Sequence, residues 1–350
     1  MPTRTNRGNT NRGNTNTQAA GPTQLQSQVP ALRIVSPAPN APDFAITDQP
    51  AMPVINAEAI ITGVNPDPTP NTVFEWTIQI RFQAQQCLHG RNRAINLDLV
   101  QTVQGRRFTP TFNLIRGGTL GLIATANVSG RQLQARIDGL RIVGTNPRRA
   151  DVHAALGNNT LRRMACQESG QRQFRGPADG GKGRCPLFSS DNLGGAGILQ
   201  LTNPRPTDDQ VWNWRSNVAA GIALFNQKQA VARAYPARVK ASRGFINAVN
   251  RFNDRRRAQG LPIMALDLPD FTPDQLELDT IRGFNGFAGI DQFGLALHEF
   301  RVAMNGNELR VVNITQTTGL LVWERVPAAD RPRSGDPNYV NNILGHSPVC

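Results

Sequence analysis

Between residues 30 and 146, apolar and polar residues alternate in short runs that Pro, Gly and Asn interrupt. In residues 73–82, every second residue from Phe74 to Phe82 is apolar, and Glu, Thr, Gln and Arg stand between them. A period of two is typical of a strand with one buried and one solvated face. It predicts strands over residues 57–63, 73–82, 94–103, 119–127 and 132–143. Several short strands with turn residues between them favour a β-sandwich of immunoglobulin-like type, acting as a binding or spacer module.

Beyond Gly144-Thr145-Asn146-Pro147, the apolar residues take a helical spacing. A firm amphipathic helix is indicated by residues at i, i+4, i+7, i+8 and i+11, namely Trp214, Val218, Gly221, Ile222 and Phe225. Further helices are predicted over 240–259, from Pro273 towards Ile281 and over 338–344, with a hairpin near 300–325 that turns at Asn305-Gly306. We therefore predict an α+β fold: an all-β module over 30–146, followed by a mainly helical domain over 147–350.

The first 28 residues contain Thr-Asn-Arg-Gly-Asn twice and almost no apolar side chains. Such a segment has too little apolar surface to bury, so it is expected to be a disordered tail.

The formal net charge of +13 favours anionic partners such as nucleic acid, cell-wall polymers or a membrane surface. Aromatic and basic residues are not interleaved as in proteins that stack single-stranded bases, so no specific nucleic acid is expected. The cluster Arg255-Arg256-Arg257 follows an apparent helix; a solvated helix end and a specific binding patch are the two interpretations. No run approaches the roughly 20 apolar residues of a membrane span, and the first residues lack a signal peptide. If the protein leaves the cytoplasm, delivery by a secretion system, by lysis or in a virion is therefore expected.

The four cysteines form no C-x-x-C pair and have no zinc-like spacing with the four histidines, so no metal site is predicted. Cys166 and Cys185 could form a disulfide outside the cytosol. The glycines at 194, 195 and 197 lack the Lys-Ser/Thr continuation of a phosphate-binding loop, and no cofactor is expected.

One acidic residue falls on the apolar side of a predicted helix. Leu161, Met164, Ala165 and Glu168 stand at i, i+3, i+4 and i+7. A carboxyl group held there loses hydration, which raises its pKa towards the range of a general acid. The alternative is a helix-end glutamate that the following Ser-Gly turns to solvent.

Four short motifs follow one another along the chain: Glu168-Ser169, Gly197-Ile198-Leu199-Gln200, Phe284-Asn285-Gly286, and Tyr339-Val340-Asn341-Asn342-Ile343-Leu344. Their order, over about residues 147–346, resembles the soluble lytic transglycosylase family, whose fold is lysozyme-like. The resemblance implies cleavage of the β-1,4 bond between N-acetylmuramic acid and N-acetylglucosamine in peptidoglycan, with a 1,6-anhydro product. It also implies action in the periplasm or cell wall, and we expect a monomer.

By the same resemblance, Glu168 is the single acid/base and Ser169 a substrate contact. Gly197 and Gln200 line the glycan groove, and Asn285 positions the sugar or the acid. Tyr339 supports the groove rather than the reacting atoms.

The resemblance also places Phe284 among the substrate-binding residues. Phe284 departs from the family pattern, because a tyrosine whose hydroxyl could bind the catalytic acid usually stands there. Tyr235 is one possible substitute for that hydroxyl.

Two other functions remain open. A lysozyme-type hydrolase would pair Glu168 with a second carboxylate, for which the candidates are Asp179, Asp191, Asp208 and Asp209. A non-catalytic wall-binding or structural protein would use the same residues only to fold.

Overall fold

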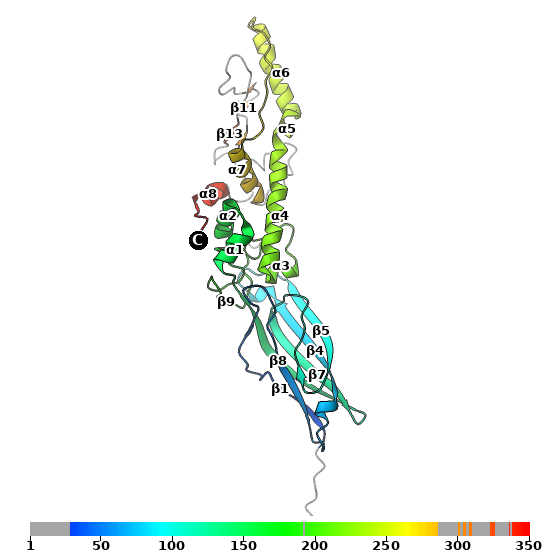
Figure 1. Cartoon of the computed structure of the whole chain (residues 1–350). Coiled ribbons are helices and arrows are strands. Elements are labelled where there is room, and N and C mark those ends of the chain that lie inside the picture. The colour runs from blue at the N-terminus through cyan, green and yellow to red at the C-terminus, as the bar shows by residue number, and fades with distance from the viewer. Residues whose placement is uncertain are drawn as a thin grey trace, which may run out of the picture.

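The computed structural model describes residues 29–191 and 193–285, together with 300–301, 304–305, 308–309, 323–325, 336 and 338–350. The described chain is elongated: the β-sheets form one end, and a column of helices extends from the other (Figure 1). The tail predicted for residues 1–28 lies outside the described residues.

Two sheets form the first part of the chain. The larger has six strands in the order β2-β8-β7-β4-β5, with β9 paired to β8, and the smaller has the order β1-β3-β6. Their bounds are β1 Ala31–Ser36, β2 Phe44–Ala45, β3 Ala57–Thr62, β4 Val73–Gln83, β5 Ala94–Gln104, β6 Arg107–Phe108, β7 Gly118–Val128, β8 Arg131–Thr145 and β9 Lys182–Gly183. The five strands predicted from the alternating pattern are confirmed as β3, β4, β5, β7 and β8.

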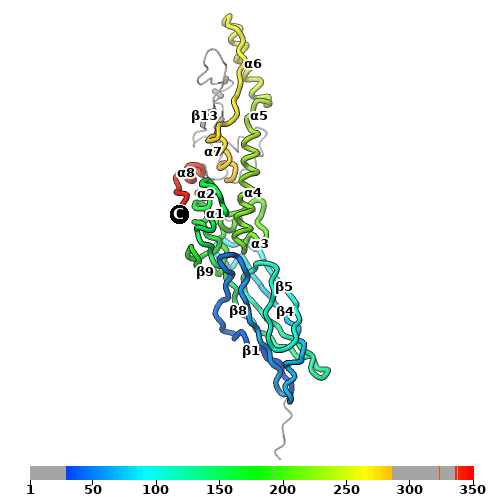
Figure 2. The backbone as a smooth tube through the Cα atoms, in the orientation of Figure 1, coloured from blue at the N-terminus to red at the C-terminus, as the bar shows by residue number. Residues whose placement is uncertain are grey.

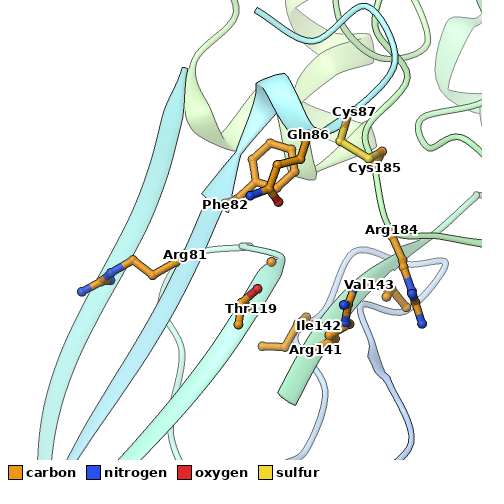
Figure 3. A pocket seen from close by; sticks show the side chains of 11 residues that line it. Arg81, Phe82, Gln86, Cys87, Thr119, Arg141, Ile142, Val143, Arg184 and Cys185 are labelled. Atoms are coloured by element: carbon orange, nitrogen blue, oxygen red, sulfur yellow. A yellow bond between two sulfur atoms is a disulfide. The ribbon is translucent and has the colours of Figure 1, made fainter. Parts of the chain in front are cut away.

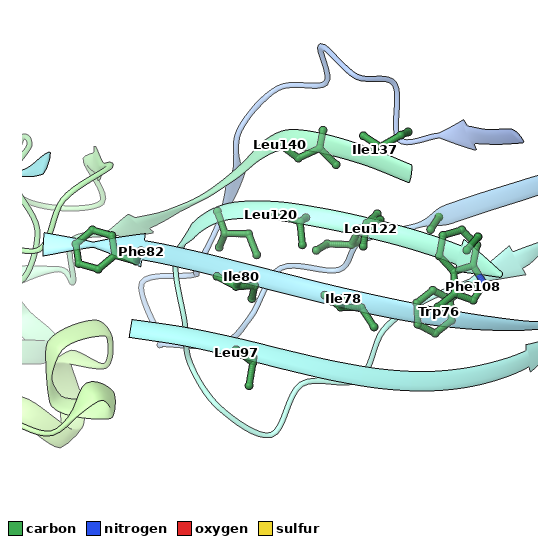
Figure 4. Packing of buried hydrophobic residues seen from close by; sticks show 14 of the residues in the cluster. Trp76, Ile78, Ile80, Phe82, Leu97, Phe108, Leu120, Leu122, Ile137 and Leu140 are labelled. Carbon is green, nitrogen blue, oxygen red and sulfur yellow. The ribbon is translucent and has the colours of Figure 1, made fainter. Parts of the chain in front are cut away.

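The core of this part lies against the apolar face of β4, as the alternation predicts. Phe74, Trp76, Ile78, Ile80 and Phe82 are all buried, and they lie on the same face of the sheet as apolar residues of β5, β7 and β8 (Figure 4). The ring of Trp76 stacks on Phe108 of the smaller sheet at 5.0 Å between centroids.

The same core includes residues that follow Pro147. Phe174 and Trp212 are buried in it, and the Trp212 ring meets Phe82 edge-on at 5.0 Å between centroids. Position 117, which packs against this ring, requires glycine, because the Cβ of any other residue would lie 2.2 Å from Trp212 Cζ3. The sheets and the first part of the helical segment therefore share one hydrophobic core.

The predicted fold class, a mainly helical lysozyme-like domain behind an immunoglobulin-like sandwich, is wrong. The structure is 34% helix and 27% strand, and the six-stranded sheet is mixed, because β2 runs parallel to β8. The described residues between Ser169 and Asp208 form turns, β9 and isolated bridges instead of helix. Repeated Gly and Pro in that stretch disfavour helix, which the wider helical periodicity did not take into account.

The helices are α1 Arg149–Leu156, α2 Asn159–Ser169, α3 Asp208–Trp212, α4 Trp214–Arg233, α5 Tyr235–Lys240, α6 Arg243–Ala258, α7 Pro273–Phe284 and α8 Tyr339–Gly345. The helices predicted from Trp214, from Pro273 and near 338–344 are confirmed. The one predicted over 240–259 is confirmed as α6. Single 3-10 turns occupy Thr69–Asn71 and Ala84–Gln86.

Helices α4, α5 and α6 follow one another end to end and form a long arm that points away from the sheets, as the backbone trace shows (Figure 2). Helix α7 lies along α4 nearer the sheets, and α8 lies beside α2 (Figure 1). None of the helices that the structure describes is long and apolar enough to cross a bilayer.

Four short strands lie in the region of the predicted hairpin. Strand β10 (Phe300–Arg301) pairs with β13 (Glu324–Arg325), and β11 (Met304–Asn305) pairs antiparallel with β12 (Glu308–Leu309). The two described strands on either side of the predicted turn are therefore antiparallel, while Gly306, where the turn was predicted, lies outside the described residues.

Both disulfides differ from the pairing considered from the sequence. Cys87 is bonded to Cys185, and Cys166 to Cys350. Linear proximity suggested Cys166 with Cys185, but the chain path carries Cys185 to the end of the larger sheet and brings Cys350 back to α2. The Cys166–Cys185 pairing is therefore wrong.

Candidate active site

Glu168 lies in the last turn of α2. The Asn158 side chain accepts a hydrogen bond from Leu161 N at 2.8 Å and caps the start of the helix. Gly170 ends it in the left-handed conformation, with φ of 60°. Leu161, Met164 and Ala165 are buried, as predicted, and Glu168 is only partly exposed.

The carboxyl group of Glu168 is bound by a hydroxyl from a distant part of the chain. Tyr339, in the first turn of α8, donates its hydroxyl hydrogen to Glu168 Oε1. Loss of hydration raises the pKa of Glu168 to about 7; the Tyr339 hydrogen bond acts in the opposite direction, and the negative charge of Asp191 adds a smaller increase.

Tyr339 is suited to remain a donor. It is buried, and both that burial and the neighbouring Glu168 carboxylate hold the pKa of its phenol well above the ordinary value. The hydroxyl therefore stays protonated wherever Glu168 titrates, and a single acid with a fixed donor forms the centre of the candidate site.

Tyr339 thus supplies the hydroxyl that the family pattern has at position 284, where this chain has Phe, and for which Tyr235 was a possible substitute. Tyr339 was expected only to support the groove, but its hydroxyl binds the acid itself. Tyr235 lies elsewhere, in an aromatic cluster with Trp323 at 5.6 Å and Phe271 at 6.0 Å between ring centroids. Phe284 is half-buried against the cluster that contains Met164 and Tyr339. The suggested role of Tyr235 is wrong, because the arm carries it away from α2.

Asn285 acts on this site through the main chain of another residue. Its side-chain amide donates to the Asp336 carbonyl at 3.0 Å, and the buried Arg282 guanidinium donates to the same oxygen at 2.8 Å. That carbonyl also accepts Tyr339 N at 3.1 Å. Asn285 and Arg282 therefore fix the start of α8, and with it the tyrosine, from the end of α7.

The other end of α8 is tied directly to α2. Beyond the helix, Cys350 is bonded to Cys166, and a ring nitrogen of His346 is hydrogen-bonded to Gln167 Oε1. Both tethers reach residues within two positions of Glu168, so α8 is held to the helix that carries the acid.

Ser169 is buried, and backbone groups occupy its hydroxyl. It donates to the Ile198 carbonyl at 2.8 Å and to the Ala165 carbonyl at 3.1 Å, and it accepts Arg172 N at 3.2 Å. Ser169 therefore joins the end of α2 to the Gly-Ile-Leu-Gln segment, which places that motif beside Glu168.

The Gly-Ile-Leu-Gln segment is held by two buried amides that sequence reasoning missed. Asn217 Oδ1 accepts Leu199 N at 3.1 Å, and Gln173 Oε1 accepts Ile198 N at 3.3 Å. Gly197 has a φ of +79°, and a Cβ there would lie 2.4 Å from Asn217 Nδ2. The sequence could have identified Asn217, because this polar residue stands three positions after Trp214, on the apolar side of α4.

The side chain of Gln200 points back into the Gly-Ile-Leu-Gln segment that contains it. It has a φ of +44° and is 9% exposed, and its amide donates to the Gly197 carbonyl at 2.8 Å. Its side-chain oxygen is buried and has no hydrogen-bond partner among the described residues. Gln200 lies in the motif segment, but its amide hydrogens are directed at the backbone.

The four candidate second carboxylates lie in different places. Asp179 accepts Arg149 N at 2.8 Å, Asp208 pairs with Arg93 at 2.6 Å, and Asp209 accepts the Ser216 hydroxyl. Asp191 is exposed and accepts Leu193 N at 2.8 Å. Of the four, Asp191 is the one whose charge acts on Glu168.

A pocket of about 190 Å³ lies at the end of the larger sheet, beside the Cys87–Cys185 disulfide (Figure 3). Arg141, Arg184 and Thr119 are among the residues that line it, whereas Glu168 and Tyr339 are not. Within the part of the chain that the structure describes, no group of three or more His, Cys, Asp or Glu residues is placed to hold a metal ion.

Comparisons with protein-family models, with curated proteins and with solved structures found no match. The likeness to lytic transglycosylases therefore rests on the four short motifs and their order. Three of these motifs, those with Glu168, Ile198 and Tyr339, meet around the end of α2.

Proposed function

We propose that this protein cleaves the glycan strands of bacterial peptidoglycan as a lytic transglycosylase, with Glu168 as the acid/base. The observation that supports the proposal is the Glu168 carboxyl group itself: its pKa is raised to about 7, and the Tyr339 hydroxyl binds its Oε1. At neutral pH, a carboxyl group with a pKa near 7 exists in both its protonated and its ionised form, so it can donate a proton and then accept one.

The reaction then needs one carboxyl group in two roles. Protonated Glu168 donates its proton to the glycosidic oxygen between N-acetylmuramic acid and N-acetylglucosamine as that bond breaks. The resulting carboxylate takes the proton of the muramic 6-hydroxyl, whose oxygen bonds to the anomeric carbon and closes the 1,6-anhydro ring. The Tyr339 hydroxyl stabilises the carboxylate between these steps and keeps it oriented. Glu168 ends protonated, and no water is consumed.

A second candidate is a hydrolase that uses Asp191 with Glu168. It is favoured by one observation, the effect of the Asp191 charge on the pKa of Glu168. Asp191 would then activate a water molecule or act as the nucleophile. The products distinguish the two reactions, because hydrolysis leaves a reducing end and transglycosylation an anhydro end.

The deciding experiment is mass spectrometry of purified peptidoglycan after incubation with the full-length protein. We expect 1,6-anhydro ends from the native protein and from Asp191→Asn, and none from Glu168→Gln. Glu75→Gln is the matched control, because Glu75 is exposed on β4, in the sheet part of the molecule. Reducing ends that disappear in Asp191→Asn would establish the hydrolase instead. Full cleavage by Glu168→Gln would exclude this acid from catalysis, and no cleavage by the native protein would favour a binding role.

A further inference from the structure

The far end of the helical arm carries a cluster of arginines beside exposed apolar side chains. Helix α6 ends at Ala258, and the chain then turns back towards α7 (Figure 2). We call residues 255–263 the arm tip. It holds the Arg255-Arg256-Arg257 cluster and the sequence Leu261-Pro262-Ile263, which the proposed reaction does not use.

Hydrogen bonds hold the backbone of the arm tip in one shape. Gly260 adopts a φ of +71°, and its N–H and that of Leu261 donate to the carbonyls of Arg257 and Arg256 at 3.0 and 2.8 Å. This pattern is a Schellman cap. Arg256 Nε then donates to the Pro262 carbonyl at 2.7 Å.

The segment that leaves the tip is fixed in the same way. The side chain of Asn253 on α6 exchanges two hydrogen bonds with the backbone of Met264, at 2.8 and 3.0 Å. Residues 261–263 are therefore presented in a defined conformation rather than as a loose loop.

Two apolar side chains remain exposed at this fixed turn. Leu261 is 44% exposed and Ile263 61%. A Schellman cap commonly packs its last residue on an apolar side chain three or four positions before the cap residue, but Arg256 and Arg255 stand at those positions here. The helix thus offers Leu261 no apolar side chain at these two positions, and Leu261 stays 44% exposed.

The charge around Leu261 and Ile263 indicates which kind of partner surface the arm tip would bind. Residues 251–263 contain four arginines and one aspartate, a formal net charge of +3. Asp254 pairs with Arg257, and the Arg256 guanidinium lies 5.9 Å from the Phe252 ring centre. Basic side chains bordering exposed apolar ones are typical of peripheral membrane contact.

We propose that the arm tip docks on anionic phospholipid bilayers, with Leu261 and Ile263 entering the interface and the arginines binding the head groups. An anionic polymer such as a nucleic acid or a wall polymer would use the arginines alone and leave both apolar side chains in water. The proposal is independent of the reaction assigned to Glu168, because the tip contains none of its residues.

The test is sedimentation of the full-length protein with vesicles of phosphatidylcholine alone and with vesicles that also contain phosphatidylglycerol. We expect binding only to the anionic vesicles. Arg255→Gln/Arg257→Gln should lower partitioning roughly 30-fold, which corresponds to about 1 kcal/mol for each arginine. Leu261→Ser/Ile263→Ser should lower it at least roughly tenfold, because two apolar side chains no longer leave water.

The matched control for charge is Arg107→Gln/Arg131→Gln, since both arginines are exposed on the sheets. Ile246→Ser is the control for apolar surface, because Ile246 is 47% exposed near the start of α6. Both controls should bind as the native protein does, and unchanged circular dichroism establishes that the tip variants are folded. Absence of binding to anionic vesicles would overturn the proposal. So would a charge control that loses as much binding as the arginine variant, or normal binding by Leu261→Ser/Ile263→Ser, which would indicate a polyanion site.

Discussion

Replacing Glu168 by Gln should stabilise the protein at alkaline pH. In the folded protein the pKa of Glu168 is about 7, against an ordinary value of 4.5. One pKa unit is worth about 1.36 kcal/mol, so ionising this carboxyl in the folded state costs roughly 3 kcal/mol more than in the unfolded chain. A Gln side chain has nearly the same shape, never ionises, and its oxygen can accept the Tyr339 hydroxyl.

The sign follows from proton binding. Between about pH 4.5 and pH 7 the folded state keeps the Glu168 proton and the unfolded state has lost it. The unfolded state binds fewer protons, so the free energy of unfolding of the native protein falls as pH rises through this window. We expect Glu168→Gln to match the native protein below about pH 4.5 and to exceed it by roughly 3 kcal/mol above pH 7.

The assay is guanidinium unfolding of both proteins, with the disulfides intact, at a series of pH values across this window. Glu75→Gln, which removes an exposed carboxyl on β4, is the matched control. A constant difference for Glu168→Gln would refute the raised pKa of this group. A variant less stable than the native protein above pH 7 would refute the reasoning as well.

Three further variants test how the site is held. Tyr339→Phe removes the hydrogen bond that lowers the pKa of Glu168, so the alkaline limb of the pH–activity profile should move to higher pH; Tyr235→Phe should leave it in place. Asn285→Ala removes one of the two side-chain donors to the Asp336 carbonyl and should lower kcat more than it raises KM, measured on purified glycan strands. Cys350→Ser breaks the tether of α8 to α2 and should lower the free energy of unfolding by about 2–4 kcal/mol in guanidinium unfolding; unchanged stability would contradict this role.

Much of the local structure was predictable because it depends on neighbours in sequence. The alternation in β4 and the spacing of Trp214, Val218 and Phe225 in α4 follow from the two backbone periods, and both elements form as expected. Thr207 and Thr272 cap α3 and α7 through bonds to residues three positions on. Glu168 was likewise found from its helical face.

The tertiary structure decided which distant groups meet. The hydroxyl that binds Glu168 comes from 171 residues along the chain, and the disulfide that holds its helix spans 184. No periodicity links such positions, because their approach depends on the whole path of the chain through the sheets and the arm.

The sequence alone therefore determined five of the strands, most of the helices and the position of one acid. Local backbone geometry and burial of one face are enough to fix these. The balance of sheet and helix, the disulfide pairing and the partner of the acid depended on packing between remote segments. The pKa of Glu168 depends on both the sequence and the tertiary structure. The helix places the carboxyl on its inner face, and the packed structure removes the water around the carboxyl and supplies the Tyr339 hydroxyl.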